Sequence, residues 1–132
     1  MGQTSILLLS DQVILRNFLS GALTREGISV LSAANYGEAE LLASAFSGRI
    51  RLLVECTATA EVEHFAARLT AAHPPMRAVV ISPTAREQLA ALPESGANPP
   101  PSLPEDLMNV LRRALSDPEL PQTVMTYFGL VS

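Results

Sequence analysis

The feature that most restricts the fold of this chain is an alternation of short apolar runs with longer segments of helical periodicity. Apolar runs occur at residues 5–9, 28–33, 52–56 and 78–82. In the segments between them, apolar residues recur at spacings of three and four, which is the pattern of a helix with one buried face. In the first such segment these residues are Leu15, Phe18, Leu19, Ala22 and Leu23. The alternation indicates a parallel sheet with helical crossovers.

The helical segments have recognisable ends. The first is predicted over about 13–26 because Gly27 follows it, and the second ends before Gly48. The third ends at Pro74 and Pro75, since proline cannot continue a helix. A short helix is predicted around 86–92, and the final helix begins near Pro104. We therefore predict an α/β fold, a doubly wound five-stranded parallel sheet of order 2-1-3-4-5 with helices on both faces.

The fifth strand is the irregular part of this prediction. The segment between the last two helices reads "PESGANPPPSLP" over 93–104. Three successive prolines remove three ladder donors, so a strand there would be short, irregular and at the sheet edge. We expect one domain over residues 1–118. The last segment, 119–132, is apolar without a clear period, and we interpret it as a tail or a linker.

Composition excludes several classes of function. With 132 residues and 48% apolar residues, the chain is long enough to bury a core. The net charge of −4 argues against direct nucleic-acid binding, which needs clustered cations. The sequence shows neither a membrane-spanning apolar stretch nor a leader peptide, and its single cysteine cannot form an internal disulfide. We expect a cytoplasmic protein without membrane contact.

Three runs of the sequence match one known family in order. They are "ILLLSDQVILRNFLSGALTREGISVLSAANYGEAELLASAF", "GRIRLLVEC" and "RAVVIS", which together lie within about 4–116. In these runs the chain resembles the receiver domains of two-component signalling. The resemblance implies two adjacent acids after the first strand and an acceptor aspartate after the third, which together hold Mg²⁺. It also implies a hydroxyl after the fourth strand and a lysine after the fifth, which stabilise the phosphoryl group.

The resemblance aligns most of these positions with residues of a different kind. Ser10 and Asp11 occupy the two acid positions, so one carboxylate remains and Mg²⁺ binding, if any, is weak; both also suit helix capping. Cys56 takes the acceptor position, or Glu55 does if the alignment slips by one residue; Glu55 would then mimic the charge of a phosphoryl group. Ser82 matches the hydroxyl position. No other cofactor is expected.

The lysine position falls on Pro100, and the chain contains no lysine at all. Arginine is not expected to replace it, because none lies between Arg86 and Arg112. The aromatic residue that the family carries on its fifth strand is also missing from 93–104, since no aromatic residue lies between Phe65 and Tyr127. The predicted pocket is therefore degenerate.

These departures lead to the hypothesis of a pseudo-receiver, a regulatory module and not an enzyme. It would bind a signalling protein, an output domain or a second copy of itself, without standard aspartyl phosphorylation. By resemblance, the interface would include the last two helices and the fifth strand, with Met108, Arg112 and Arg113 as candidates. Two alternatives stay open: a receiver of a transcriptional regulator that responds to phosphate through an unusual site, and a small-ligand or redox sensor that uses Cys56.

Overall fold

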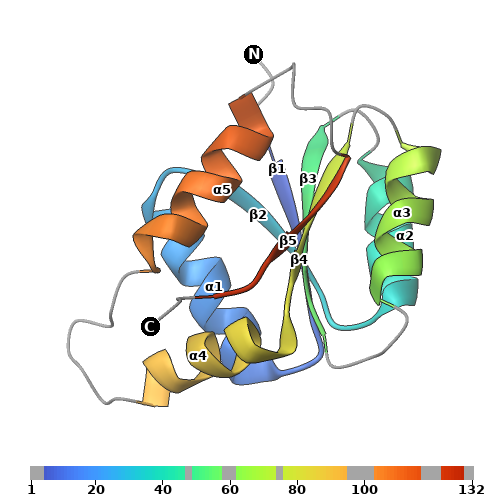
Figure 1. The fold of residues 1–132 in the computed structure, drawn as a ribbon. Helices are drawn as coiled ribbons and strands as arrows, with labels where there is room; N and C mark the ends of the chain where they lie inside the picture. Colours follow the sequence, from blue (N-terminus) through green and yellow to red (C-terminus); the bar gives the residue numbers. More distant parts are fainter. Residues whose placement is uncertain are drawn as a thin grey trace.

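Five parallel strands form one sheet in the order β2-β1-β3-β4-β5 (Figure 1). The computed structural model describes residues 5–46, 49–57, 62–73, 76–94, 103–116 and 123–129, with backbone alone at 62, 63, 93 and 94. The predicted fold class and strand order are confirmed. The strands are β1 (Ser5–Ser10), β2 (Ser29–Ala33), β3 (Ile50–Cys56), β4 (Arg77–Ile81) and β5 (Val124–Tyr127).

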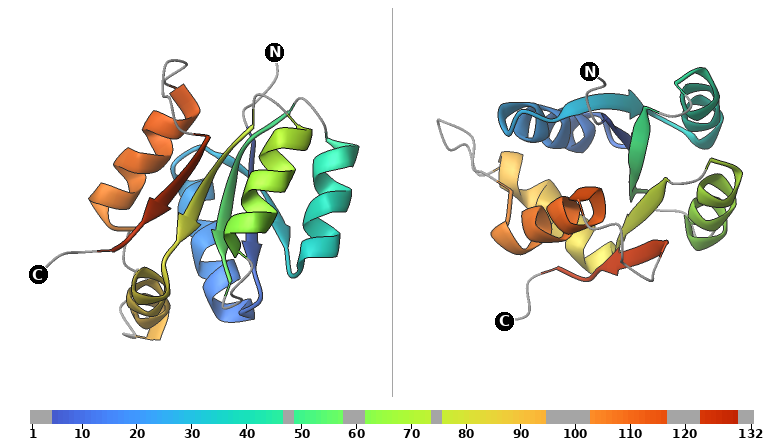
Figure 2. Two further views of the ribbon diagram at one scale, coloured as in Figure 1. Left: turned by 45° about the vertical axis from the view of Figure 1, so that its right-hand side comes forward. Right: turned by 90° about the horizontal axis from the view of Figure 1, so that it is seen from above.

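Helices cover both faces of this sheet, and each face has its own core. The helices are α1 (Val13–Arg25), α2 (Tyr36–Ala45), α3 (Val62–Ala72), α4 (Pro83–Glu94) and α5 (Glu105–Ser116). Helices α1, α4 and α5 lie on one face, and α2 and α3 lie on the other (Figures 1 and 2). Because side chains alternate along a strand, Leu8 and Val54 belong to the first core, and Leu7 and Leu53 to the second.

The fifth strand is not where the sequence analysis placed it. It comes after the last helix, in the segment interpreted as a tail, and pairs in parallel with β4 from Ala78↔Val124 to Ile81↔Tyr127. The proline-rich stretch 95–102, in which an irregular strand was expected, lies outside the described residues. The chain therefore passes from β4 through α4 and α5 before it re-enters the sheet, and residues 124–127 belong to the domain's sheet.

This last crossover has the opposite hand to the other three. The connection from β3 to β4 moves along the sheet in the same direction as the connection from β4 to β5. The first passes over the face of α3, whereas the second passes over the opposite face, through α4 and α5 (Figure 2). Parallel crossovers are right-handed in roughly 98% of cases, so a pattern of strands and helices does not predict a reversal.

The parallel strands all end at the same edge of the sheet, where α1 and α4 begin. Ligands of open α/β sheets bind at this edge, so a functional site is expected there. In the described part of the chain, no helix is long and apolar enough to span a bilayer.

Candidate functional site

The carboxyl ends of β1 and β3 place the predicted site residues side by side. In the parallel pairing of β1 and β3, Ser10 is the register partner of Cys56, and Leu9 is the register partner of Glu55. Ser82 directly follows β4, the next strand in the sheet. These positions match those that the resemblance assigns, but their side chains face different environments.

Ser10 and Asp11 do not cap helix α1, contrary to the sequence analysis. The N-cap residue is Gln12, and its side chain makes no capping hydrogen bond. The Ser10 side chain is buried, and its hydroxyl accepts a hydrogen bond from the Gln12 N–H at 3.3 Å. Arg16 donates to the Ser10 carbonyl at 2.9 Å, whereas Asp11 is exposed. Only Asp11 presents a carboxylate to solvent among these residues.

Cys56 is a core residue at the end of β3. Its side chain is 0% exposed and packs in the core beneath α1, α4 and α5. Burial raises the pKa of Cys56 to about 12; the positive charge of Arg86 lowers it in part, and Asp11 raises it. The thiol is therefore protonated near neutral pH. A protonated, buried thiol is a poor nucleophile, which counts against the redox-sensor alternative.

We expect Cys56 of the folded protein to react with a thiol reagent such as Ellman's reagent only as fast as the protein opens. A suitable control is the Cys56→Ala/Ser44→Cys variant, because Ser44 is exposed on α2. A thiol of ordinary pKa at that position should react at least about 1000-fold faster near neutral pH, since far more of it is thiolate. Equal labelling rates for the two proteins would contradict the burial of Cys56.

Glu55 points to the opposite face of the sheet from Cys56 and is also fully buried, with 0% of its surface exposed. Its Oε1 accepts a hydrogen bond from the Thr57 hydroxyl at 3.5 Å, and the Tyr36 hydroxyl also bonds to the carboxyl group. Its Oε2 has no hydrogen-bond partner among the described residues. Burial raises the pKa of Glu55 from 4.5 to about 8, because these hydrogen bonds offset the desolvation only in part.

A neutral, enclosed carboxyl group cannot present a negative charge to solvent. The raised pKa keeps Glu55 mostly protonated near neutral pH. Its side chain faces α2 and α3, away from Cys56 and the core under α4. Both observations argue against Glu55 as a permanent mimic of a phosphoryl group.

Ser82 acts locally at the start of α4. Its hydroxyl accepts a hydrogen bond from the Ala85 N–H at 3.2 Å, which caps the helix. Its own N–H donates to the carbonyl of Tyr127 at 2.9 Å. An aromatic residue is thus present on the fifth strand after all, because β5 lies at 124–127. The Tyr127 hydroxyl donates to Asp106 at 2.9 Å, which joins β5 to the first turn of α5.

Arg86 is the site residue that the sequence analysis missed. It lies in the first turn of α4, where its backbone N–H bonds to the Ser82 carbonyl at 2.8 Å. Its positive charge lowers the pKa of Cys56 and so offsets part of the effect of burial. Its buried Nη1 has no hydrogen-bond partner among the described residues. The useful signal was its spacing four residues after Ser82, because the first turn of a helix after a strand stays close to the strand ends. Pro100, assigned to the lysine position, lies outside the described residues.

The residues at this edge do not fit a magnesium ion. Mg²⁺ requires several oxygen ligands in near-octahedral arrangement. Among the residues aligned with the family's site, Asp11 carries the one exposed carboxylate, the Ser10 hydroxyl bonds to Gln12, and Cys56 offers a protonated sulfur. Over the described part of the chain, no group of three or more His, Cys, Asp or Glu side chains is placed to hold a metal ion.

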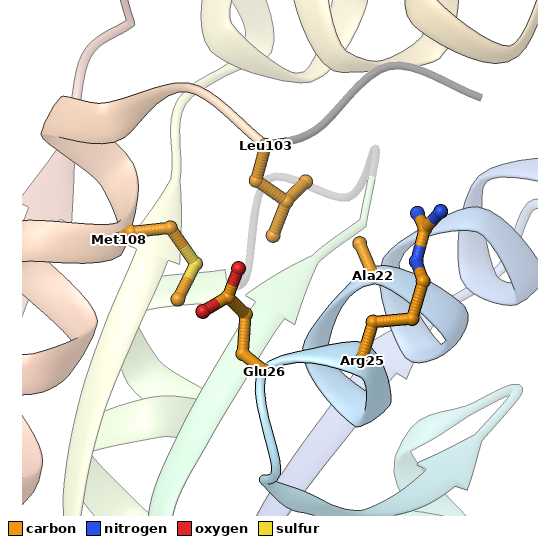
Figure 3. A pocket seen from close by; sticks show the side chains of 5 residues that line it. All are labelled: Ala22, Arg25, Glu26, Leu103 and Met108. Atoms are coloured by element: carbon orange, nitrogen blue, oxygen red, sulfur yellow. The ribbon is translucent and has the colours of Figure 1, made fainter. Parts of the chain in front are cut away.

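A small pocket lies near the C-terminal end of α1, between α1 and α5. It has a volume of about 100 Å³ and is lined by Ala22, Arg25, Glu26, Leu103 and Met108 (Figure 3). Ligand pockets typically enclose about 300–1,000 Å³, so this one suits a single side chain or a few waters.

The proposed interface residues near this pocket differ in exposure. Met108 is 5% exposed and packs in the core, so its assignment as a surface contact is wrong. Arg112 and Arg113 are exposed on α5. Arg112 forms an ion pair at 3.2 Å with Glu26, the C-cap residue of α1, which leaves Arg113 more available to a partner.

Comparison with solved structures places this fold among receiver domains. The chemotaxis protein CheY4 of Vibrio cholerae matches with a TM-score of 0.60 and 20% identity, over 86% of this chain and 100% of that protein. A receiver domain protein of Clostridium thermocellum matches with a TM-score of 0.63 and 16% identity, over 85% and 94%. The response regulator TrrA of Thermotoga maritima, solved with Mg²⁺ and BeF, matches with a TM-score of 0.57 and 21% identity, over 86% and 100%.

These identities are low, so the likeness establishes the fold, that of a receiver-like α/β domain, and nothing finer. No family model matches the sequence, and no curated protein matches it.

Proposed function

We propose that this chain is a receiver-like signalling module that works through protein–protein contact and does not undergo magnesium-dependent aspartyl phosphorylation. In this role it is a regulatory domain of two-component-type signalling and not an enzyme. Its partner is a signalling protein, an output domain or a second copy of the chain. We place its action in the cytoplasm.

The observation that carries this proposal is the environment of the acceptor position. A phosphoacceptor needs an ionised carboxylate that solvent and donor can reach. Cys56 is instead a fully buried thiol whose pKa is raised to about 12 by burial. The neighbouring carboxyl group of Glu55 is enclosed on the other face of the sheet, and its pKa is raised to about 8 by the same cause. Neither side chain is suited to attack a phosphodonor.

The interface that we propose lies on α4, α5 and β5, where Arg112 and Arg113 are exposed. These three elements are connected to one another at the carboxyl end of β5. Tyr127 bonds to Asp106 at the start of α5, and Gly129 approaches Ala85 of α4 so closely that a Cβ would lie 3.1 Å from its Cα. Gly129 has a φ of +92°, which favours glycine.

The proposal is tested by an amide NMR titration with Mg²⁺ and beryllofluoride. We expect no saturable shift of the Ser10, Asp11, Cys56 or Ser82 signals, because Asp11 alone remains of the three acids that the resemblance implies for the metal site. The Asp11→Asn variant is the matched control, since it removes the exposed carboxylate that the resemblance aligns with a metal ligand. Saturable shifts that disappear in Asp11→Asn would overturn the proposal and favour a phosphate-responsive receiver.

A further inference from the structure

Glu55, Tyr36 and Thr57 form a buried polar cluster that the proposed function does not use. The Tyr36 and Thr57 hydroxyls are 3.5 Å apart, and Thr57 donates to Glu55 Oε1 at the same distance. Glu55 lies at the end of β3 and Tyr36 is the first residue of α2. The cluster therefore joins the start of α2 to the carboxyl edge of the sheet.

Aromatic packing extends this connection to α3. The Tyr36 ring stacks on Phe65 with centroids 4.4 Å apart and an interplanar angle of 27°. Phe65 is buried in the core that α2 and α3 share. If Tyr36 moved, it would lose this stacking contact and uncover the carboxyl group of Glu55.

No cation compensates a charge on Glu55 within the described part of the chain. The side chains that face it from β1 and β4 are those of Leu9 and Val80, both apolar. On α3, His64 and Arg68 are exposed, and Arg68 pairs with Glu40 of α2 at 3.2 Å. The acids of α2 that the structure describes, Glu38 and Glu40, are exposed as well. A buried charge without a counter-charge is strongly unfavourable.

We propose that the protonation state of Glu55 controls the packing of α2, so that this end of the domain responds to pH. The neutral carboxyl group stays enclosed beneath Tyr36. The ionised group requires water, and the first turn of α2 moves away from β3 and α3 to admit it. The surface formed by α2 and α3 then differs between the two states. This inference is independent of the phosphorylation-independent binding proposed above.

The sign of the pH dependence follows from the direction of the shift. The pKa of Glu55 is 4.5 in the unfolded chain and about 8 in the folded one. Between these values the folded state keeps a proton that the unfolded state has lost, so stability falls as pH rises through this window. The midpoint of thermal unfolding should fall by about 4 °C per pH unit between about pH 6 and pH 8.

The test is a carbon NMR titration of the Glu55 carboxyl group, followed together with the signals of Tyr36 and Phe65. We expect all three to change along one curve with a midpoint near 8. The Glu55→Gln variant keeps the shape of the side chain but cannot ionise. In this variant the signals of Tyr36 and Phe65 should no longer change with pH, and the midpoint of thermal unfolding should stay constant between about pH 6 and pH 8. The control Glu87→Gln, an exposed acid on α4, should retain these pH-dependent changes.

Three outcomes would overturn the inference. The carboxyl carbon could titrate near 4.5, it could titrate without any change at Tyr36 and Phe65, or the Glu55→Gln variant could keep the wild-type profile. If that variant does not fold, the wild-type titration alone decides. Unequal midpoints for Glu55 and Tyr36 then reject the coupling.

Discussion

The Tyr127→Ala variant should lose about 3 kcal/mol of unfolding free energy, whereas the neighbouring Phe128→Ala should change it by less than about 0.5 kcal/mol. Tyr127 is 6% exposed at the end of β5 and bonds to Asp106, whereas Phe128 is 72% exposed. Removing the ring of Tyr127 leaves a cavity against α5 and takes one hydrogen bond from Asp106, whose carboxylate still accepts the Leu107 N–H. Removing the ring of Phe128 has neither effect.

This pair of variants is measured by urea unfolding, and it tests the position of the fifth strand. If residues 119–132 were a tail outside the domain, both substitutions would have similar and small effects. A large loss at Phe128 with none at Tyr127 would mean that the strand is displaced by one residue, because such a slip exchanges the two faces of a strand.

The Phe65→Ala variant should lose about 3–5 kcal/mol of unfolding free energy, which is the usual cost of deleting a buried aromatic ring. Phe65 is 2% exposed, stacks on Tyr36 and lies in the core beneath α2 and α3. The loss should be accompanied by a lower pKa for Glu55, since the cavity lets water reach the carboxyl group. Urea unfolding at several pH values measures the loss of unfolding free energy, and its pH dependence gives the pKa of Glu55.

Leu41→Ala on α2 is the matched control for this variant. Leu41 is 72% exposed, so its substitution should leave both stability and the pKa of Glu55 unchanged. A Phe65→Ala protein that is destabilised by less than about 1 kcal/mol would contradict the packing of α3 on the sheet. A destabilised protein with an unchanged pKa for Glu55 would show that Phe65 does not shield the carboxyl group.

The local elements could be predicted well because each has a local cause. The runs "SILLL" and "LLVEC" are buried strands since apolar residues fill both faces, and Gly27 follows the end of α1 with a φ of +81°. The side chain of Asn35 accepts a hydrogen bond from the Glu38 N–H and so caps the start of α2, within the predicted turn. These features depend on neighbours in the sequence, and they were correct to within a few residues.

The candidate site could be predicted in position but not in chemistry. Alignment of the strand ends brought Ser10 and Cys56 to the same level. It could not show that Glu55 and Cys56 point to opposite faces into closed cores, or that Arg86 acts on Cys56. Burial raises both pKa values, and burial depends on helices distant in the sequence.

By itself, the sequence determined the alternating elements, the parallel sheet and the absence of lysine from any pocket. Only the tertiary structure decided that β5 comes from residues 124–127 and that α4 lies on the same face as α1. The physical reason is that strand pairing and helix docking are long-range choices. A short apolar segment such as "VMTY" does not indicate by its sequence which strand it pairs with. In the folded protein it pairs with the edge of β4, and Tyr127 bonds to Asp106 of α5.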